Sequence, residues 1–200
     1  ARAVLNDLAL FEAAGAPEAY APLVLEHARD LAGMVASGNG PVDYTIGKDT
    51  MATVQPSDSP LPLALAAMAL IKGQELFQEA QFVDLAMGLL DSLSESHGTL
   101  TLTAAGESDG YNPFLPSEVP GLVLAAKALT LGGDRLNVDE FLRAGENLRL
   151  DLLALWDRDN GGVPMLVIRD GGYAPSPLRS LDDQIAVLGL ARNDALPWWQ

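Results

Sequence analysis

Leu65-Ala-Ala-Met-Ala-Leu70 is the stretch that decides the fold, because similar stretches recur along the chain. They are Leu5-Asn-Asp-Leu-Ala-Leu10, Leu124-Ala-Ala-Lys-Ala-Leu129 and Ile185-Ala-Val-Leu-Gly-Leu190, at offsets of about 60 residues. Each is rich in Ala and Leu and predicts a helix that is apolar on most of its surface. Such a helix is buried on several sides, so the repeat predicts four inner helices.

A second, amphipathic helix is expected after each of the first three inner helices, following a short break. The breaks are expected at Gly15-Ala-Pro17, Lys72-Gly-Gln74 and Gly132-Gly-Asp134, with a fourth at Arg192-Asn-Asp194. The outer helices are expected over residues 17–37, 75–96 and 138–157. In the third of these, Phe141 and Leu148 lie on one face and Arg143 and Glu146 on the other, as the period of an α-helix requires.

Extended segments are expected after the outer helices, where a Gly-rich turn leads into β-branched residues. These segments are Val42–Ile46, Thr99–Thr103 and Val163–Ile168. Polar loops that contain Pro then return the chain to the next inner helix, at residues 55–60, 109–118 and 173–180.

Together these elements predict an all-α fold of helical-hairpin repeats that form a partial α/α toroid, with short extended segments between the hairpins. The approximate repeats are 1–60, 61–118 and 119–181, and residues 182–200 begin a fourth. Common helical repeats run to about 33 to 47 residues. The longer period here reflects the extended loop and favours a toroid.

The composition excludes several classes of protein. The chain of 200 residues has 12 Lys plus Arg against 27 Asp plus Glu, a net charge of -15 and no Cys. Disulfide scaffolds and thiolate metal sites need Cys, and nucleic-acid binding needs surplus positive charge. With 48% apolar and 20% charged residues, the chain is unusually apolar, so a protein partner or a homo-oligomer is expected.

Other features of the sequence bear on location. The longest apolar stretch, Leu61–Ile71, is about half of what a membrane span requires, so none is expected. A cytoplasmic chain is expected, with an exported mature chain as the alternative because the sequence opens at Ala1 rather than Met. Trp198-Trp199 would be costly to leave in water, which predicts that they are buried against a partner or against a continuation of the chain. The 200 residues are also expected to be part of a larger folded unit.

Residues 122–194 carry a resemblance to a known family. An inner helix at 122–129 is followed by Leu155-Trp-Asp-Arg-Asp-Asn-Gly-Gly162, an extended segment and Leu181-Asp-Asp-Gln-Ile-Ala-Val-Leu-Gly-Leu-Ala191. This order resembles the six-hairpin glycosidase-like toroids, most of all the helical region of the spermatogenesis-associated thioredoxin-domain family. In that family an outer helix ends in an aromatic-Asp-x-x-x-Gly-Gly turn, and a loop brings a polar residue to the start of the next inner helix.

The resemblance implies a fold more than an activity. It implies a ring of six hairpins, whereas this chain supplies three and the start of a fourth. The redox function of that family is not expected for this chain, because the chain has no Cys-x-x-Cys motif. In glycosidase-like toroids the chemistry lies where loops meet the N-terminal ends of the inner helices.

Several carboxylates fall at those positions. Glycoside hydrolysis needs a pair of them, and Glu118 and Asp183 are the candidate acid and base. Asp58, Asp109 and Asp182 are candidate ligand-binding residues. The alternative is helix capping, with Ser180-Leu-Asp-Asp183 resembling a capping box.

Aromatic residues in the loops form a second candidate set. They are Tyr44, Tyr111, Phe114 and Tyr173. Their rings could stack on a sugar, which makes carbohydrate a candidate ligand, or they could plug the narrow end of the ring.

No metal or cofactor is expected. Asp157-Arg-Asp-Asn-Gly-Gly162 resembles the start of a calcium loop but lacks its later ligands, so a turn is the favoured interpretation. His27 and His97 lie 70 residues apart, without zinc-ligand spacing, and each is expected at the surface or at a helix end.

The leading hypothesis is therefore a non-catalytic interaction or scaffold subunit, built on an incomplete α/α toroid that packs against a partner chain. The alternative is a carbohydrate-active, glycoside hydrolase-like toroid that uses Glu118 and Asp183. A third hypothesis is a portion of a thioredoxin-fused protein.

Overall fold

The computed structural model describes residues 1–38, 42–46, 52–56, 59–103, 117–157, 159, 161–169, 172–176 and 178–191. Over residues 42–46, 52–56 and 169 it describes the backbone alone. The helices in this part of the chain are α1 (Arg2–Ala13), α2 (Ala21–Ala36), α3 (Pro60–Phe77), α4 (Ala80–His97), α5 (Val119–Leu136), α6 (Asp139–Ala154) and α7 (Leu181–Ala191). The strands are β1 (Val42–Ile46), β2 (Ala52–Pro56), β3 (Leu166–Arg169) and β4 (Gly172–Pro175). The predicted all-α class is confirmed.

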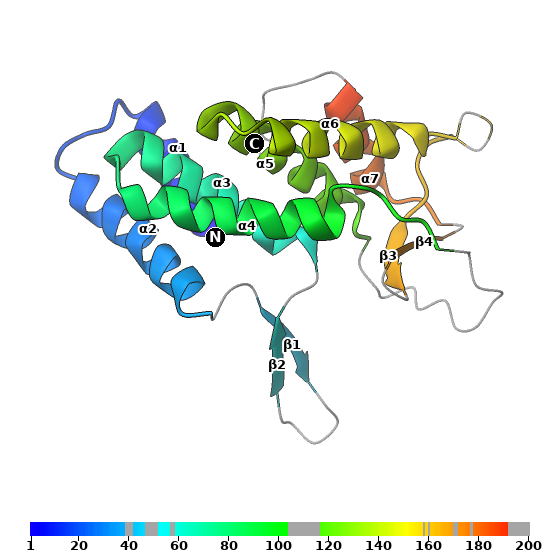
Figure 1. Ribbon diagram of the computed structural model, residues 1–200, viewed down its shortest axis with the longest axis horizontal. Helices are drawn as coiled ribbons and strands as arrows, with labels where there is room; N and C mark the ends of the chain where they lie inside the picture. Colours follow the sequence, from blue (N-terminus) through cyan, green and yellow to red (C-terminus); the bar gives the residue numbers. More distant parts are fainter. Residues whose placement is uncertain are drawn as a thin grey trace.

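The helices form two layers. One layer holds α1, α3, α5 and α7, each in contact with the next, and the other holds α2, α4 and α6. Within the hairpins, α1 packs on α2, α3 on α4, and α5 on α6. In Figure 1, α4 and α6 lie in front of α3 and α5. The four similar stretches of sequence therefore fall in one layer.

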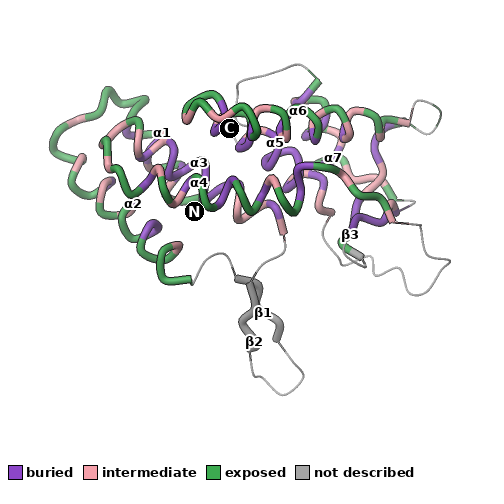
Figure 2. The backbone as a smooth tube through the Cα atoms, in the orientation of Figure 1, coloured by how far each residue is buried: buried purple, intermediate pink, exposed green. Residues whose placement is uncertain are grey.

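The core lies along α3 and α5. Ala64, Ala67 and Leu70 of α3 are buried, as are Leu122 and Leu129 of α5. Figure 2 shows buried residues continuing along these two helices. The outer helices complete the core with fully buried side chains, namely Phe82 and Leu90 of α4 and Phe141, Leu148 and Leu152 of α6. Burying a Leu or Phe side chain contributes about 1.5–3 kcal/mol, so this apolar seam is the main source of stability.

Two of the predicted breaks are wrong. Helix α3 continues through Lys72-Gly-Gln74 and α5 through Gly132-Gly-Asp134. The helices end four and three residues later, at Gln78 and Asn137, which adopt left-handed backbone conformations with φ of 56° and 57°. The glycines stay helical because they sit at helix contacts. A Cβ on Gly132 would overlap the side chain of Leu90 in α4.

The outer helices lie within or close to their predicted ranges. Helix α2 begins at Ala21, with Pro22 in its first turn, rather than at residue 17. Helix α4 begins at Ala80 because α3 is longer than expected. On the exposed face of α6, Asp139 pairs with Arg143 and Glu146 with Arg149, at 3.8 and 2.7 Å. The break expected at residues 192–194, and Trp198-Trp199, lie outside the described residues.

The strands form two antiparallel hairpins, β1–β2 and β3–β4. The extended segment at residues 42–46 is confirmed, and its hairpin extends away from the helices (Figure 1). Strands β2 and β4 fall partly in the segments predicted as loops, so those predictions are wrong at Gln55–Pro56 and at Tyr173–Pro175. The Thr99–Thr103 segment joins β4, because Tyr173 N donates to Thr101 O at 2.9 Å and Thr103 N donates to Tyr173 O at 3.0 Å.

Candidate functional site

The starts of α3, α5 and α7 share a group of polar side chains, which we name the mouth cluster. Its members are Ser59, His97, Ser117, Glu118, Tyr173 and Asp183. Ser59 precedes α3, Ser117 and Glu118 precede α5, and Asp183 lies in the first turn of α7. The layer of inner helices is what brings these positions together.

Glu118 is the half-buried carboxylate of the cluster. Its Oε2 accepts a hydrogen bond from the Ser59 hydroxyl at 2.9 Å. Its backbone N–H donates to the carbonyl oxygen of Leu166 in β3 at 2.8 Å. The β3–β4 hairpin therefore fixes the residue from which α5 begins.

Tyr173 and His97 form a buried hydrogen-bonded pair. The hydroxyl oxygen of Tyr173 lies 2.7 Å from His97 Nδ1, and the two ring centroids are 6.2 Å apart. Burial raises the pKa of Tyr173, and the charge of Glu118 raises it further. The phenol therefore stays protonated and Glu118 lies within electrostatic reach of it.

His97 lies at a helix end, which is one of the two positions expected for it. The imidazole stands at the end of α4, but it is buried. The helical period of the sequence could have predicted this burial, because Leu90 and Leu93 precede His97 by seven and four residues and are buried on the same face. His27 does lie at the surface, where its Nδ1 is 3.0 Å from Asp7 Oδ2.

Asp183 is the most deeply buried charged residue of the cluster, with 1% of its surface exposed. Neither carboxylate oxygen makes a hydrogen bond. Burial raises the pKa of this carboxyl, the nearby Ser117 hydroxyl opposes the rise, and the charge of Asp182 adds to it. The neutral acid is therefore favoured at a higher pH than for an exposed Asp.

Residues other than Asp183 fix the start of α7. The Ser180 hydroxyl accepts the N–H of Asp182 at 3.2 Å, which is a helix cap. Because the Asp183 oxygens make no hydrogen bond, the expected capping box is present only in its Ser180 half. The Gln184 amide bonds both the N–H and the carbonyl of Val163, at 2.9 and 2.8 Å, and so anchors α7 to the segment before β3.

The remaining predicted site residues are placed as follows. Asp182 is exposed beside Asp183 in the first turn of α7. Tyr44 pairs with Val54 across the β1–β2 hairpin, and its side chain is not among those described. Asp58, Asp109, Tyr111 and Phe114 lie outside the described residues.

The calcium-like loop is a turn in the residues described. Asp157 and Gly162 exchange both backbone hydrogen bonds, at 3.0 and 2.9 Å, and Asp157 Oδ1 accepts the N–H of Asp159 at 2.9 Å. Asp157 Oδ2 accepts a hydrogen bond from Arg179 at 3.3 Å. Across the described side chains, no group of three or more His, Asp and Glu residues could hold a metal ion.

The chemistry available to the mouth cluster is limited by burial. Glu118 is partly exposed and can meet a ligand, whereas Asp183 contacts protein groups on all sides. An acid and base pair would need both carboxyls to reach one substrate.

A second candidate site is an exposed apolar face of α7, which we name the α7 stripe. It consists of Leu181, Ile185 and Leu188, which are 74%, 51% and 44% exposed. They are spaced four and three residues apart and therefore share one face. The opposite face of α7 is buried, through Ala186, Val187 and Leu190.

Among the helices that the structure describes, none is both long enough and apolar enough to cross a bilayer. No protein-family model matches the chain, and no curated protein and no solved structure matches it either.

Proposed function

We propose that the chain is a non-catalytic interaction or scaffold module, an open array of helical hairpins whose α7 edge packs against a partner chain. The observation that carries this proposal is the α7 stripe. Three large apolar side chains on one helix face are costly to leave in water and are typical of an interaction surface.

A comparison of how neighbouring helices cover α3 and α7 supports this proposal. Helix α3 is apolar on nearly all sides, and α1, α4 and α5 cover it. Helix α7 is also apolar on two opposite faces, but its described contacts are with α5 and α6. A helix that is apolar all round is normally buried all round, so the stripe is the face that a further helix would cover.

The exposed surface of α1, at the other end of the helix array, differs from that of α7. Helix α1 exposes the polar residues Arg2, Asn6 and Glu12, and one large apolar side chain, Leu10. The exposed surface of α1 is therefore mainly polar, whereas one whole face of α7 is apolar and exposed.

Charge favours a particular kind of partner. The chain carries a net charge of -15, so two copies would repel each other. A helix with an apolar stripe flanked by Lys or Arg would satisfy both the stripe and the charge. Leu178, exposed just before α7, extends the apolar surface toward the roughly 800 Å² per partner that a specific interface needs.

The test compares the double variant Ile185→Gln/Leu188→Gln with Leu150→Gln. Leu150 is a matched control because it is 50% exposed but lies on α6, outside the stripe. Purified wild-type chain should bind a hydrophobic fluorescent dye and a synthetic 18-residue helix of Leu and Lys. The double variant should lose most dye binding and bind the helix at least tenfold more weakly, with Leu150→Gln unchanged. Equal binding by all three proteins would refute the proposal.

A second candidate is a carbohydrate-active toroid, which one observation favours. Glu118, partly exposed, and Asp183, with its raised pKa, stand at the starts of neighbouring inner helices. A raised pKa suits a general acid and a partly exposed carboxylate suits a base, but catalysis would also require the enclosed Asp183 to reach the substrate that Glu118 meets. Release of reducing ends from a polysaccharide panel should then be lost in Glu118→Gln and in Asp183→Asn. Absence of release by the wild type would remove this candidate.

A further inference from the structure

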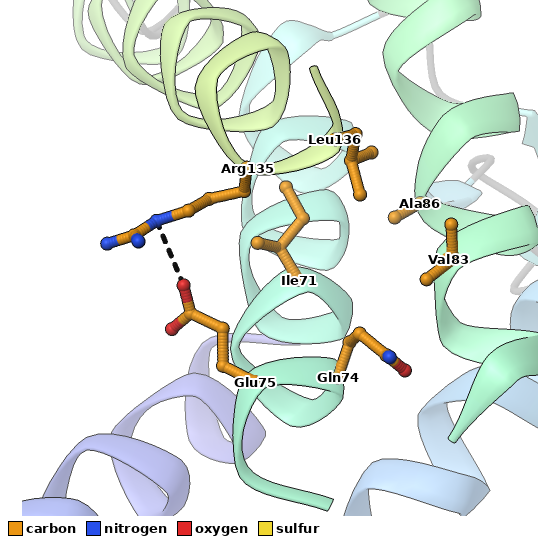
Figure 3. Close-up of a pocket in the computed structure, with 7 residues that line it drawn as sticks. All are labelled: Ile71, Gln74, Glu75, Val83, Ala86, Arg135 and Leu136. Atoms are coloured by element: carbon orange, nitrogen blue, oxygen red, sulfur yellow. Dashed lines mark ion pairs between the residues drawn. The ribbon is translucent and has the colours of Figure 1, made fainter. Parts of the chain in front are cut away.

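The β1–β2 hairpin lacks the support that the helices give one another. Helix α3 packs on α5, and near their C-terminal ends Arg135 Nε lies 3.0 Å from Glu75 Oε1 (Figure 3). Within the described elements, by contrast, the main contacts of β1 and β2 are with each other, and the hairpin extends away from the helices (Figure 1). A two-stranded hairpin alone is marginally stable in water and needs a third strand or a covering layer.

The register of the hairpin separates apolar from polar residues. Positions that alternate along a strand share one face of the sheet. The cross-strand pairs of one face join aliphatic, aromatic or proline residues, namely Val42 with Pro56, Tyr44 with Val54 and Ile46 with Ala52. The pairs of the other face are polar, namely Asp43 with Gln55 and Thr45 with Thr53. This alternation is typical of strands in a sheet that has one face covered.

The edge of β1 is suited to accept a further strand. The β1–β2 sheet has two strands, so within the described chain each strand has one unpaired edge. In an antiparallel pair, every second residue directs its N–H and C=O away from the partner strand. Strand β1 contains no Pro, whereas β2 ends in Pro56, which has no N–H to donate. The edge of β1 is therefore the better template.

Charge indicates which kind of strand fits this edge. Asp43 is the only charged residue in β1 and β2. Opposite charges directly across a strand pair are stabilising, and like charges are destabilising. A second copy of the chain would bring a further net charge of -15, whereas a strand with Lys or Arg beside Asp43 is attracted.

We propose that the edge of β1 binds an extended segment of a basic partner protein, which adds a third strand to the hairpin. In this segment, β-branched or aromatic residues alternate with Lys or Arg. The apolar residues fall on the face of Val42, Tyr44 and Ile46, and the basic residues fall on the face of Asp43. Main-chain hydrogen bonds supply the affinity, and the alternation supplies the specificity. This surface is independent of the α7 stripe.

The test measures binding of labelled synthetic peptides to the full chain by fluorescence anisotropy in 0.15 M NaCl. A nine-residue peptide of alternating Val and Lys should bind saturably. The N–H groups of Val and of Lys point to opposite edges of an added strand, so N-methylation of one set should weaken binding at least tenfold and N-methylation of the other should not. A peptide of the same composition, with Val and Lys in separate blocks, should also bind at least tenfold more weakly.

Two results would overturn the proposal. The first is no binding of the parent peptide, or equal binding of all four peptides, as a diffuse attraction between opposite charges would give. The second is dimerisation of the purified chain that the peptide inhibits, which would assign the edge to a second copy.

Charge variants locate the site. Asp43→Lys should weaken binding of the parent peptide at least threefold, as loss of a surface charge pair implies. Asp30→Lys makes the same charge change at an exposed position of α2 and should leave binding nearly unchanged, as should Ile185→Gln/Leu188→Gln. Equal weakening by Asp43→Lys and Asp30→Lys would refute the assignment to β1. The peptide comparison on the wild-type chain remains decisive if the hairpin does not form in Asp43→Lys.

Discussion

At the scale of single residues, the mouth cluster is stabilised by the contact between Tyr173 and His97. Tyr173→Phe removes a buried hydroxyl and its 2.7 Å hydrogen bond without changing the ring. We expect the free energy of unfolding in urea to fall by about 1–2 kcal/mol. Tyr20→Phe, at an exposed position, is the control and should change it little. Equal effects of the two substitutions would show that the Tyr173 hydroxyl is not stabilising.

Asp183 predicts a pH dependence of stability. Because its pKa is raised in the folded protein, the folded state holds this proton more tightly than the unfolded chain. The resulting stabilisation is fully present below the unfolded pKa of about 3.9 and is lost as pH rises through the folded pKa. Asp183→Asn removes this titration, so its stability relative to wild type should increase between pH 4 and pH 8.

The measurement for Asp183 is urea unfolding across that pH range. Asp30→Asn, at an exposed position of α2, is the control for removing one negative charge elsewhere in the chain. A difference for Asp183→Asn that shrinks as pH rises would contradict the buried-acid interpretation.

At the scale of elements, the contact between α5 and α6 depends on glycine. A Cβ on Gly145 would lie 2.8 Å from Thr130 N and 2.9 Å from Ala126 O, both backbone atoms of α5. Gly145→Ala should therefore destabilise the protein by about 1–3 kcal/mol. Gly88→Ala, with no atom near the added Cβ in α4, should instead stabilise it by about 0.5–1 kcal/mol. Thermal unfolding distinguishes the two, and the same sign for both would contradict this packing.

Two other glycines, Gly73 and Gly132, show why the ends of the inner helices are hard to predict from the sequence. The Ala and Leu stretches placed the inner helices, because an all-round apolar helix has a strong pattern. Gly73 and Gly132 were read as breaks, since a close helix contact and a helix end both favour glycine. The folded structure distinguishes the two cases, because Phe82 packs against Gly73 and Leu90 packs against Gly132.

The candidate site was predictable to a similar extent. The positions of Glu118 and Asp183 at inner-helix starts followed from the repeat. The pairing of His97 with Tyr173 did not, because it joins residues 76 apart through strand β4, most of which the sequence predicts to be a loop. Long-range contacts of this kind carry no local periodicity.

At the scale of the whole molecule, net charge should govern the response to salt. The imbalance of 27 acidic against 12 basic residues makes self-repulsion larger than the attraction within the surface ion pairs. Raising NaCl from 10 mM to 0.5 M shortens the screening length, so the midpoint of thermal unfolding should rise by about 2–4 °C, the shift expected for about 1 kcal/mol. KCl at the same concentrations should raise the midpoint of thermal unfolding by the same amount, because screening depends on ionic strength. A fall in the midpoint would mean that the ion pairs dominate.

The central claim is that the α7 stripe is covered in the native assembly. Since the chain has no Cys, Ile185→Cys and Leu150→Cys each introduce a single thiol. The measurement is the rate of maleimide labelling, in fresh extract of cells that make the protein and in dilute purified protein. We expect at least tenfold slower labelling at position 185 in the extract and unchanged labelling at position 150. Equal labelling of position 185 in both preparations would contradict it.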